Sequence, residues 1–154
     1  MHGGPVALAD AVMPPIAMSE ALARLCAIFE NPPGLSWRPD YPPVPDDLRA
    51  EACACLAGVR PWTAPVDLPT LRLWLAPVVG SVRNPPRGRD DQIWLAAVAL
   101  AVNGLARGAF TSATQQETLR RNAFLPSAAD VYDRVKDEAA RIRRRVATLE
   151  KVAA

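Results

Sequence analysis

Residues 125–152 read LPSAADVYDRVKDEAARIRRRVATLEKV and carry the clearest structural pattern in the chain. Apolar residues recur there every three or four positions, which places their side chains on one face of an α-helix. Leu125 and Pro126 lead into Ser127, whose hydroxyl is suited to cap the first turn. The pattern predicts an amphipathic helix over residues 127–152, about 39 Å long at about 1.5 Å per residue. Its apolar stripe consists of Val131, Val135, Ala139, Ile142, Val146 and Leu149.

The spacing of this stripe indicates how the helix packs. Its offsets of four, four, three, four and three residues follow a period near 3.6, whereas a strict heptad would bring Glu138 and Arg145 into the apolar seam. We therefore expect a straight helix that packs on its own domain, and not one strand of a left-handed coiled coil.

The rest of the chain also favours helices. Alanine is abundant, and the 16 prolines cluster between the helical patterns. No alternating run is long enough to predict a β-sheet. Five shorter helices are expected, over residues 19–29, 45–59, 67–78, 90–102 and 112–122. The predicted fold is an all-α bundle of about five or six helices with proline-rich connections and a long amphipathic C-terminal helix.

Length and composition predict one domain. A chain of 154 residues with 50% hydrophobic content can bury a single core. We assign residues 1–18 to a flexible N-terminal segment and residues 19–154 to one helical domain. That domain contains a proline-rich loop at residues 31–45 and a basic loop at residues 80–89.

Three details of the shorter helices follow from single residues. Pro77 should kink or stop its helix, because proline lacks the amide hydrogen. Residues 93–102 are apolar on every side, so we expect their helix to be buried all round at the centre of the bundle. Thr114 and Glu117 have the spacing of a capping box.

Few side chains are suited to catalysis or metal binding. The chain has three cysteines (Cys26, Cys53 and Cys55) and one histidine (His2), whereas structural zinc needs four such ligands. We expect reduced thiols buried in the core of a cytoplasmic protein. No glycine-rich nucleotide motif is present, and the apolar run at residues 93–102 is too short to span a membrane. The sequence therefore predicts no metal, no cofactor, no membrane contact and no enzyme activity.

Charge is distributed unevenly along the chain. Residues 1–77 contain five arginines and eight acidic residues (net −3), whereas residues 78–154 contain thirteen Arg or Lys and eight acidic residues (net +5). An anionic partner such as nucleic acid would therefore suit the C-terminal half.

The densest basic cluster is at residues 141–145. Asp130–Arg134 and Asp137–Arg141 are spaced four residues apart in the favourable order, so we expect these pairs to form within the helix. A solvated helix face is one interpretation of the cluster. In the other, it binds nucleic acid or a protein partner. Arg143 and Arg144 have no acidic residue four positions earlier, so they are candidates for such binding. Three arginines of the basic loop are further candidates: Arg83, Arg87 and Arg89.

The tryptophans divide into two groups. Trp74 and Trp94 lie on apolar helical stripes and are expected in the core. Trp37 and Trp62 lie in proline-rich loops, so they are the candidate interface aromatics.

Residues 122–132 read NAFLPSAADVY. This segment resembles one in small phage and prophage replication accessory proteins, including helicase-loader-like helical domains. In these, a bulky residue and Pro-Ser/Thr open a helix with an acid in its first turn. The resemblance covers residues 108–132 and implies an all-helical fold, no catalysis, and contacts with a replicative helicase or single-stranded DNA. The proline-rich N-terminal half departs from it, so no functional residue is carried over.

These features predict a non-catalytic adaptor or accessory protein, phage or prophage related. It would bind a protein partner such as a replicative helicase, and nucleic acid, near a replication complex. The alternative is a structural or self-assembling protein of a virion or regulatory system that uses the C-terminal helix as its interface. The sequence leaves open the oligomeric state and whether the basic residues converge on one face.

Overall fold

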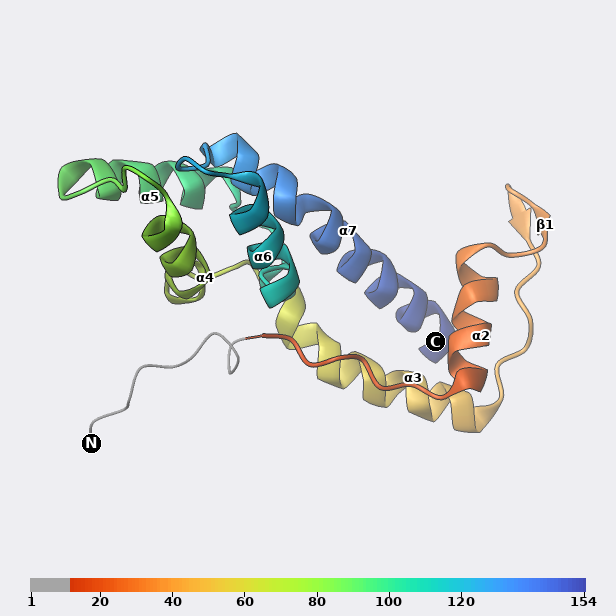
Figure 1. Cartoon of the computed structure of the whole chain (residues 1–154). Coiled ribbons are helices and arrows are strands. Elements are labelled where there is room, and N and C mark those ends of the chain that lie inside the picture. Colours follow the sequence, from red (N-terminus) through yellow and green to blue (C-terminus); the bar gives the residue numbers. More distant parts are fainter. Residues whose placement is uncertain (1–11) are drawn as a thin grey trace, which may run out of the picture. The chain divides into compact units, whose positions relative to one another are not determined.

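The computed structural model describes residues 12–154, so His2 and most of the predicted segment at residues 1–18 lie outside the described part. Within that part the chain forms six α-helices, and its one sheet has two strands of two residues each (Figure 1). The predicted all-α fold is therefore confirmed. The helices are α2 (Glu20–Glu30), α3 (Asp46–Val59), α4 (Leu68–Ser81), α5 (Arg89–Ala101), α6 (Ser112–Arg121) and α7 (Ala128–Ala153).

Helix α7 begins and ends within one residue of its predicted bounds. At its start the Ser127 hydroxyl accepts a hydrogen bond from the Asp130 amide (3.1 Å), and the Asp130 carboxylate accepts one from the Ser127 amide (3.0 Å). This reciprocal cap holds the first turn. Five of the six stripe residues are fully buried, and Val146 is half-buried. The stripe therefore packs inside the protein, as its period predicts.

The chain forms two compact units. Of the described residues, the central unit contains 12–13 and 62–142, and the terminal unit contains 14–61 and 143–154. Helix α7 supplies residues to both units. The expectation that residues 19–154 behave as one domain stays a prediction.

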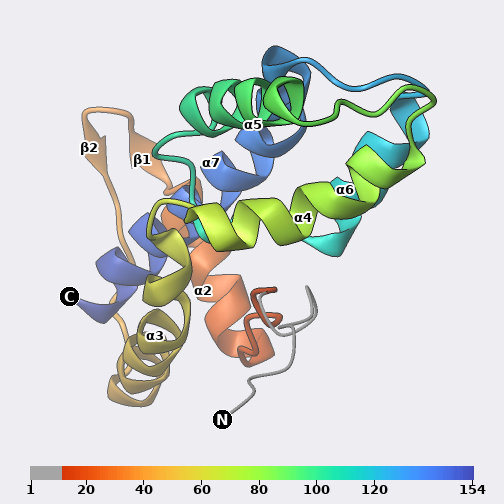
Figure 2. The ribbon, with the colours of Figure 1, turned by 90° about the vertical axis from the view of Figure 1, so that its left-hand side faces the viewer.

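The core of the central unit is built around Trp74 and Phe110, whose rings meet edge to face with centroids 5.5 Å apart. The Trp74 indole N–H donates to the Thr111 carbonyl (3.0 Å), and the Gln115 side-chain amide donates to the Trp74 carbonyl (2.8 Å). These bonds join α4 to α6, which lie side by side (Figure 2). Trp74 is a core residue, as predicted.

The terminal unit has an apolar core of its own. The Ser19 hydroxyl caps α2 by accepting from the Leu22 amide (3.1 Å) and itself donates to the Glu51 carboxylate of α3 (2.8 Å). Burying apolar surface from three helices stabilises this unit. The fully or nearly fully buried side chains are Leu22, Leu25, Cys26 and Phe29 of α2, Ala52, Leu56 and Val59 of α3, and Leu149 and Val152 of α7.

Pro77 does not stop its helix, because α4 continues to Ser81. A proline inside a helix removes one amide donor and crowds the carbonyl four residues earlier, yet the helix here continues for one more turn. Val78, immediately after the proline, is buried, and its carbonyl accepts a hydrogen bond from the Ser81 hydroxyl (3.0 Å). The basic loop is consequently shorter than expected and covers residues 82–88 instead of 80–89.

The prediction that α5 is buried on all sides is wrong. Val98 is the only residue of α5 that is fully buried, and the exposed fraction is 58% for Ile93 and 78% for Leu100. The apolar core of the central unit covers one face of the helix and leaves the opposite face in solvent. Apolar residues all round a helix show that it can be buried on every side, but they do not supply the neighbours that would bury it.

The capping box of α6 is one turn earlier than predicted. The Thr111 hydroxyl accepts from the Thr114 amide (3.2 Å), and the Thr114 hydroxyl accepts from the Thr111 amide (3.0 Å). Thr114 is therefore the third residue of the helix and not its cap. Its hydroxyl can serve the role usually filled by Glu or Gln because a threonine at this position also reaches the cap amide.

A small hairpin, which no pattern in the sequence predicts, interrupts the proline-rich loop at residues 31–45. Strands β1 (Gly34–Leu35) and β2 (Arg38–Pro39) pair in antiparallel fashion across a two-residue turn at Ser36 and Trp37. Gly34 has a φ of 97°, and a Cβ at this position would lie 2.9 Å from the Arg38 carbonyl oxygen. Only glycine fits here without displacing the backbone.

Candidate interaction surfaces

The basic cluster on α7 is partly neutralised, but not by the predicted pairs. Arg141 forms two hydrogen bonds to Glu138 (2.6 and 2.9 Å) and not an ion pair with Asp137. This contact lowers the pKa of Glu138 and raises that of Arg141. The Asp130 carboxylate caps the helix start, and its hydrogen bond from the Ser127 amide lowers its pKa. Asp130 and Glu138 therefore stabilise α7 through local contacts.

Arg143 and Arg144 are both exposed on the terminal unit. Arg144 lines a groove with Lys151, which lies two turns further along α7, and with Phe29, Glu30 and Asn31 at the end of α2. Two cations and one carboxylate therefore border this groove. Its formal charge of +1 favours an anionic ligand only weakly.

An aromatic pair lies next to this groove. The Phe29 and Tyr41 rings are stacked with centroids 4.8 Å apart, and the Lys151 ammonium lies 5.8 Å from the centroid of the Tyr41 ring. Tyr41 remains partly exposed. A flat ring beside a cation is a combination that proteins use to stack bases of single-stranded nucleic acid while binding the phosphate backbone.

The three arginines of the basic loop are exposed and belong to the central unit. Arg83 and Arg87 lie in the connection after α4, and Arg89 is the first residue of α5. Residues 141–142 of the predicted basic cluster belong to the central unit, whereas Arg143 and Arg144 belong to the terminal unit.

Trp37 and Trp62 have different surroundings. Trp37 is at the turn of the β1–β2 hairpin with 76% of its surface exposed, and its neighbour Leu35 is 56% exposed. Trp62 is half-buried in the central unit, and the Arg107 guanidinium lies 4.5 Å from its ring centroid. Trp37 is therefore the more accessible of the two candidate aromatics. The cation–π contact of Trp62 could not be predicted from sequence, because its partner is 45 positions away (107 − 62).

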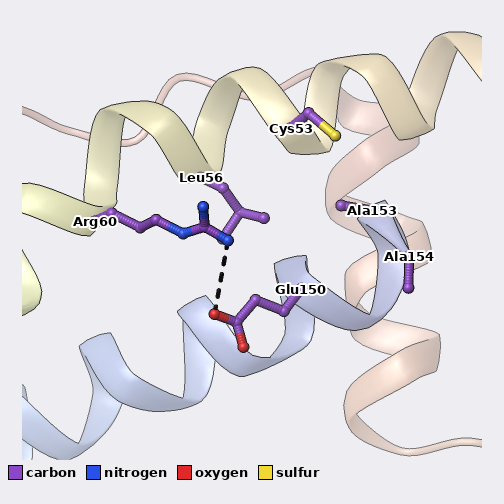
Figure 3. Close-up of a pocket in the computed structure, with 6 residues that line it drawn as sticks. All are labelled: Cys53, Leu56, Arg60, Glu150, Ala153 and Ala154. Carbon is purple, nitrogen blue, oxygen red and sulfur yellow. Dashed lines mark ion pairs between the residues drawn. The ribbon is translucent and has the colours of Figure 1, made fainter.

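The cysteines are not all buried, contrary to the expectation. Cys26 is buried, Cys55 is half-buried and Cys53 is exposed. Burial raises the pKa values of the Cys26 and Cys55 thiols. Cys53 borders a pocket between α3 and the end of α7, where Arg60 and Glu150 form an exposed ion pair at 4.0 Å (Figure 3). Within residues 12–154, no group of three or more His, Cys, Asp or Glu side chains is placed to hold a metal ion.

A further exposed surface, which the sequence does not predict, lies on α5. Its residues recur at the spacing i, i+3, i+4 and i+7, so they form one stripe opposite the buried Val98. We refer to this stripe as the α5 outer face: Ile93, Ala96, Ala97 and Leu100. This stripe is the part of α5 that the core of the central unit leaves exposed.

Known proteins offer no assignment for these surfaces: no family model, no curated protein and no solved structure matches the chain. In the described part of the chain, no helix combines the length and apolar character needed to cross a membrane.

Proposed function

We propose that this protein is a non-catalytic, cytoplasmic helical adaptor that binds a protein partner through Trp37. The observation that carries the proposal is the position of Trp37, which is 76% exposed at the turn of a paired hairpin. In keeping with the resemblance of residues 108–132, the proposed setting is a phage or prophage replication complex, and the proposed partner is a replicative helicase.

The geometry of the hairpin supports a protein contact. Tryptophan is the side chain most enriched at the energetic centres of interfaces, because it buries a large rigid surface at little entropic cost. The Asp40 amide donates to the Pro33 carbonyl (2.7 Å), which closes the base of the hairpin. Leu35 adds a second exposed apolar side chain next to the turn. A preorganised turn loses less conformational entropy on binding than a free loop would.

The groove bordered by Arg144 and Lys151 supports a second contact, to single-stranded nucleic acid. Its two cations would contact phosphates, and Tyr41 offers a ring on which a base can stack. This contact would be weak, since Glu30 lies in the same groove.

The alternative, assembly through α7, would have to use the polar face of this helix. The apolar stripe of α7 is buried within the chain, so only the polar face of this helix is open to a partner. Polar helix faces carry fewer stable interfaces than apolar ones.

The protein contact is tested by titrating the full chain with a purified replicative helicase and measuring affinity by biolayer interferometry. Trp37→Ala should weaken binding on the order of tenfold or more. Leu68→Ala is the matched control, because Leu68 is also exposed but lies on the central unit. No binding by the unaltered chain, or equal losses in both variants, would contradict the proposal.

The nucleic-acid contact is tested with a fluorescein-labelled oligothymidine and anisotropy at several salt concentrations. Arg144→Glu with Lys151→Glu should abolish binding, whereas Arg83→Glu with Arg87→Glu, which makes the same charge change on the central unit, should not. Binding that is independent of salt, or lost equally in both double variants, would count against the groove.

A further inference from the structure

Helices α4 and α6 of the central unit run in the same direction. Asp67, which precedes α4, forms an ion pair at 3.9 Å with Arg107, which precedes α6. Further along both helices, the Gln115 side-chain amide donates to the Trp74 carbonyl (2.8 Å). Because later residues of one helix meet later residues of the other, the C-terminal ends of α4 and α6 lie at the same end of the pair.

The connections that leave these two ends run side by side (Figure 2). Residues 82–88 join α4 to α5, and residues 122–127 join α6 to α7. The connections also meet at their far end, because the Trp94 indole N–H of α5 donates to the Pro126 carbonyl (2.8 Å). Two consecutive prolines restrict the backbone of the first connection. The fold therefore holds the two connections together as one surface.

Exposed arginines and one exposed aromatic ring gather on this surface. We refer to the following residues as the arginine surface: Arg83, Arg87, Arg120, Arg121 and Phe124. Phe124 is 64% exposed. Arg121 pairs with Glu117 of its own helix at 2.8 Å. Within residues 12–154 the other three arginines form no ion pair, so their guanidinium groups are available to a ligand.

Acidic residues limit the charge of this surface and the size of the ligand it suits. Asp90 and Asp91 open α5 immediately after Arg89. With Arg89 and these acids included, and with Glu117, the surface and its border contain five arginines and three acidic residues, a net charge of +2 (5 − 3). A long polyanion that continued past Arg87 would meet the acids of α5. A short anionic ligand can contact the arginines alone.

We infer that the arginine surface binds a short acidic segment of a protein partner, in which an apolar side chain lies among the carboxylates. Guanidinium groups bind carboxylates through two parallel hydrogen bonds, and Phe124 offers a ring to the apolar side chain. Single-stranded nucleic acid is less suited, because it stacks successive bases on several rings and this surface has one. The surface differs from the Trp37 hairpin and from the groove of Arg144, so the inference is independent of the proposed function.

The first experiment titrates the full chain into a fluorescein-labelled peptide of Asp and Glu residues with one central Phe, and measures anisotropy. Arg83→Glu and Arg120→Glu, one from each connection, should each weaken binding about three- to tenfold, and added salt should weaken it further. Arg72→Glu is the matched control, because Arg72 is also exposed but lies about 14 Å from the end of α4, nine residues at about 1.5 Å each. Circular dichroism checks that all variants remain helical. No binding by the unaltered chain below about 1 mM, or an equal loss in Arg72→Glu, would overturn the inference.

The second experiment tests the role of the ring and the class of ligand. Phe124→Ala should weaken binding of the peptide with Phe but leave unchanged the weaker binding of a peptide in which Ser replaces this Phe. Unlabelled oligothymidine should not displace the acidic peptide. Displacement by oligothymidine that is lost in Arg83→Glu would identify nucleic acid as the ligand of this surface, and equal effects of Phe124→Ala on both peptides would exclude the apolar contact. Either result would overturn the inference.

Discussion

Replacement of Leu22 by alanine tests whether the two compact units unfold as one domain. Leu22 belongs to α2, is fully buried in the terminal unit, and makes no contribution to the core of the central unit. Removing its three outer carbon atoms should lower the free energy of unfolding by about 2–5 kcal/mol, which includes the cost of the cavity left behind. The experiment asks whether this substitution also destabilises the central unit.

The course of α7 gives a physical reason to expect that the central unit is destabilised as well. Helix α7 is continuous, and it supplies Val135 and Ile142 to the core of the central unit and Leu149 and Val152 to that of the terminal unit. Neither core is complete without this helix. Unfolding of the terminal unit exposes the second half of α7, and its unwinding should destabilise the first half because helix formation is cooperative.

The assay compares two probes during thermal unfolding in a Trp37→Phe background. With Trp37 replaced, the remaining tryptophans (Trp62, Trp74 and Trp94) all belong to the central unit, so fluorescence reports on that unit alone. Far-UV circular dichroism reports on the helices of both units. For a cooperative domain of this length, Leu22→Ala should lower both midpoints together by about 5–15 °C.

A different outcome would refute the reasoning. If the fluorescence midpoint stays within about 1 °C while part of the circular dichroism signal is lost at lower temperature, the units unfold separately. In that case the midpoint of the terminal unit should fall by up to about 8 °C per kcal/mol, since a unit of about 60 residues has a small unfolding entropy. Leu35→Ala, an exposed position in the same unit, should change the free energy by less than about 0.5 kcal/mol and serves as the control.

Three further predictions concern single hydrogen bonds. Thr111→Ala removes the hydroxyl that caps α6 by accepting a hydrogen bond from the Thr114 amide. Urea unfolding should show that the free energy of unfolding falls by about 1 kcal/mol. Asp67 caps α4, and hydrogen bonds from Thr70, the backbone amide first, lower the pKa of its carboxyl. The ionised Asp67 carboxylate therefore stabilises the folded chain above the unfolded pKa of about 3.9, and this stabilisation is lost as pH falls through the lower folded pKa. Asp67→Asn should therefore flatten the fall in stability below about pH 4, and a parallel pH profile would contradict this. Trp94→Phe leaves the Pro126 carbonyl without its indole N–H donor (2.8 Å). The free energy of unfolding, measured by thermal unfolding, should fall by about 1–3 kcal/mol. An unchanged value would show that water replaces the indole and would contradict this prediction.

The long C-terminal helix could be predicted from sequence because each of its signals is local. Ser127 and Asp130 are three residues apart, and the apolar stripe repeats every turn, so cap and buried face are both readable in one segment. The same holds for Ser19 as the cap of α2. The hairpin was missed for the opposite reason. Two strands of two residues contain no periodic pattern, and their pairing depends on the positive φ of Gly34.

The candidate surfaces were predictable only in part, because exposure depends on distant residues. A proline-rich setting indicated an exposed position for Trp37, and the structure confirms that it is exposed. The same signal pointed to Trp62, which is instead half-buried under Arg107. The pairing of Arg141 with Glu138 in place of Asp137 is a choice between two acids on adjacent helix positions, and side-chain rotamers decide it.

The most informative difference between expectation and structure is on α5. The apolar composition of α5 predicts burial on every side, but the structure buries this helix on one side only. Burial of the exposed parts of Ile93 and Leu100 would contribute roughly 2–4 kcal/mol of free energy that the chain does not gain on folding. A helix that only had to pack on one side would serve as well with polar residues at these two positions, and α7 has this ordinary amphipathic pattern. The unused free energy becomes available when a matching surface covers the outer face.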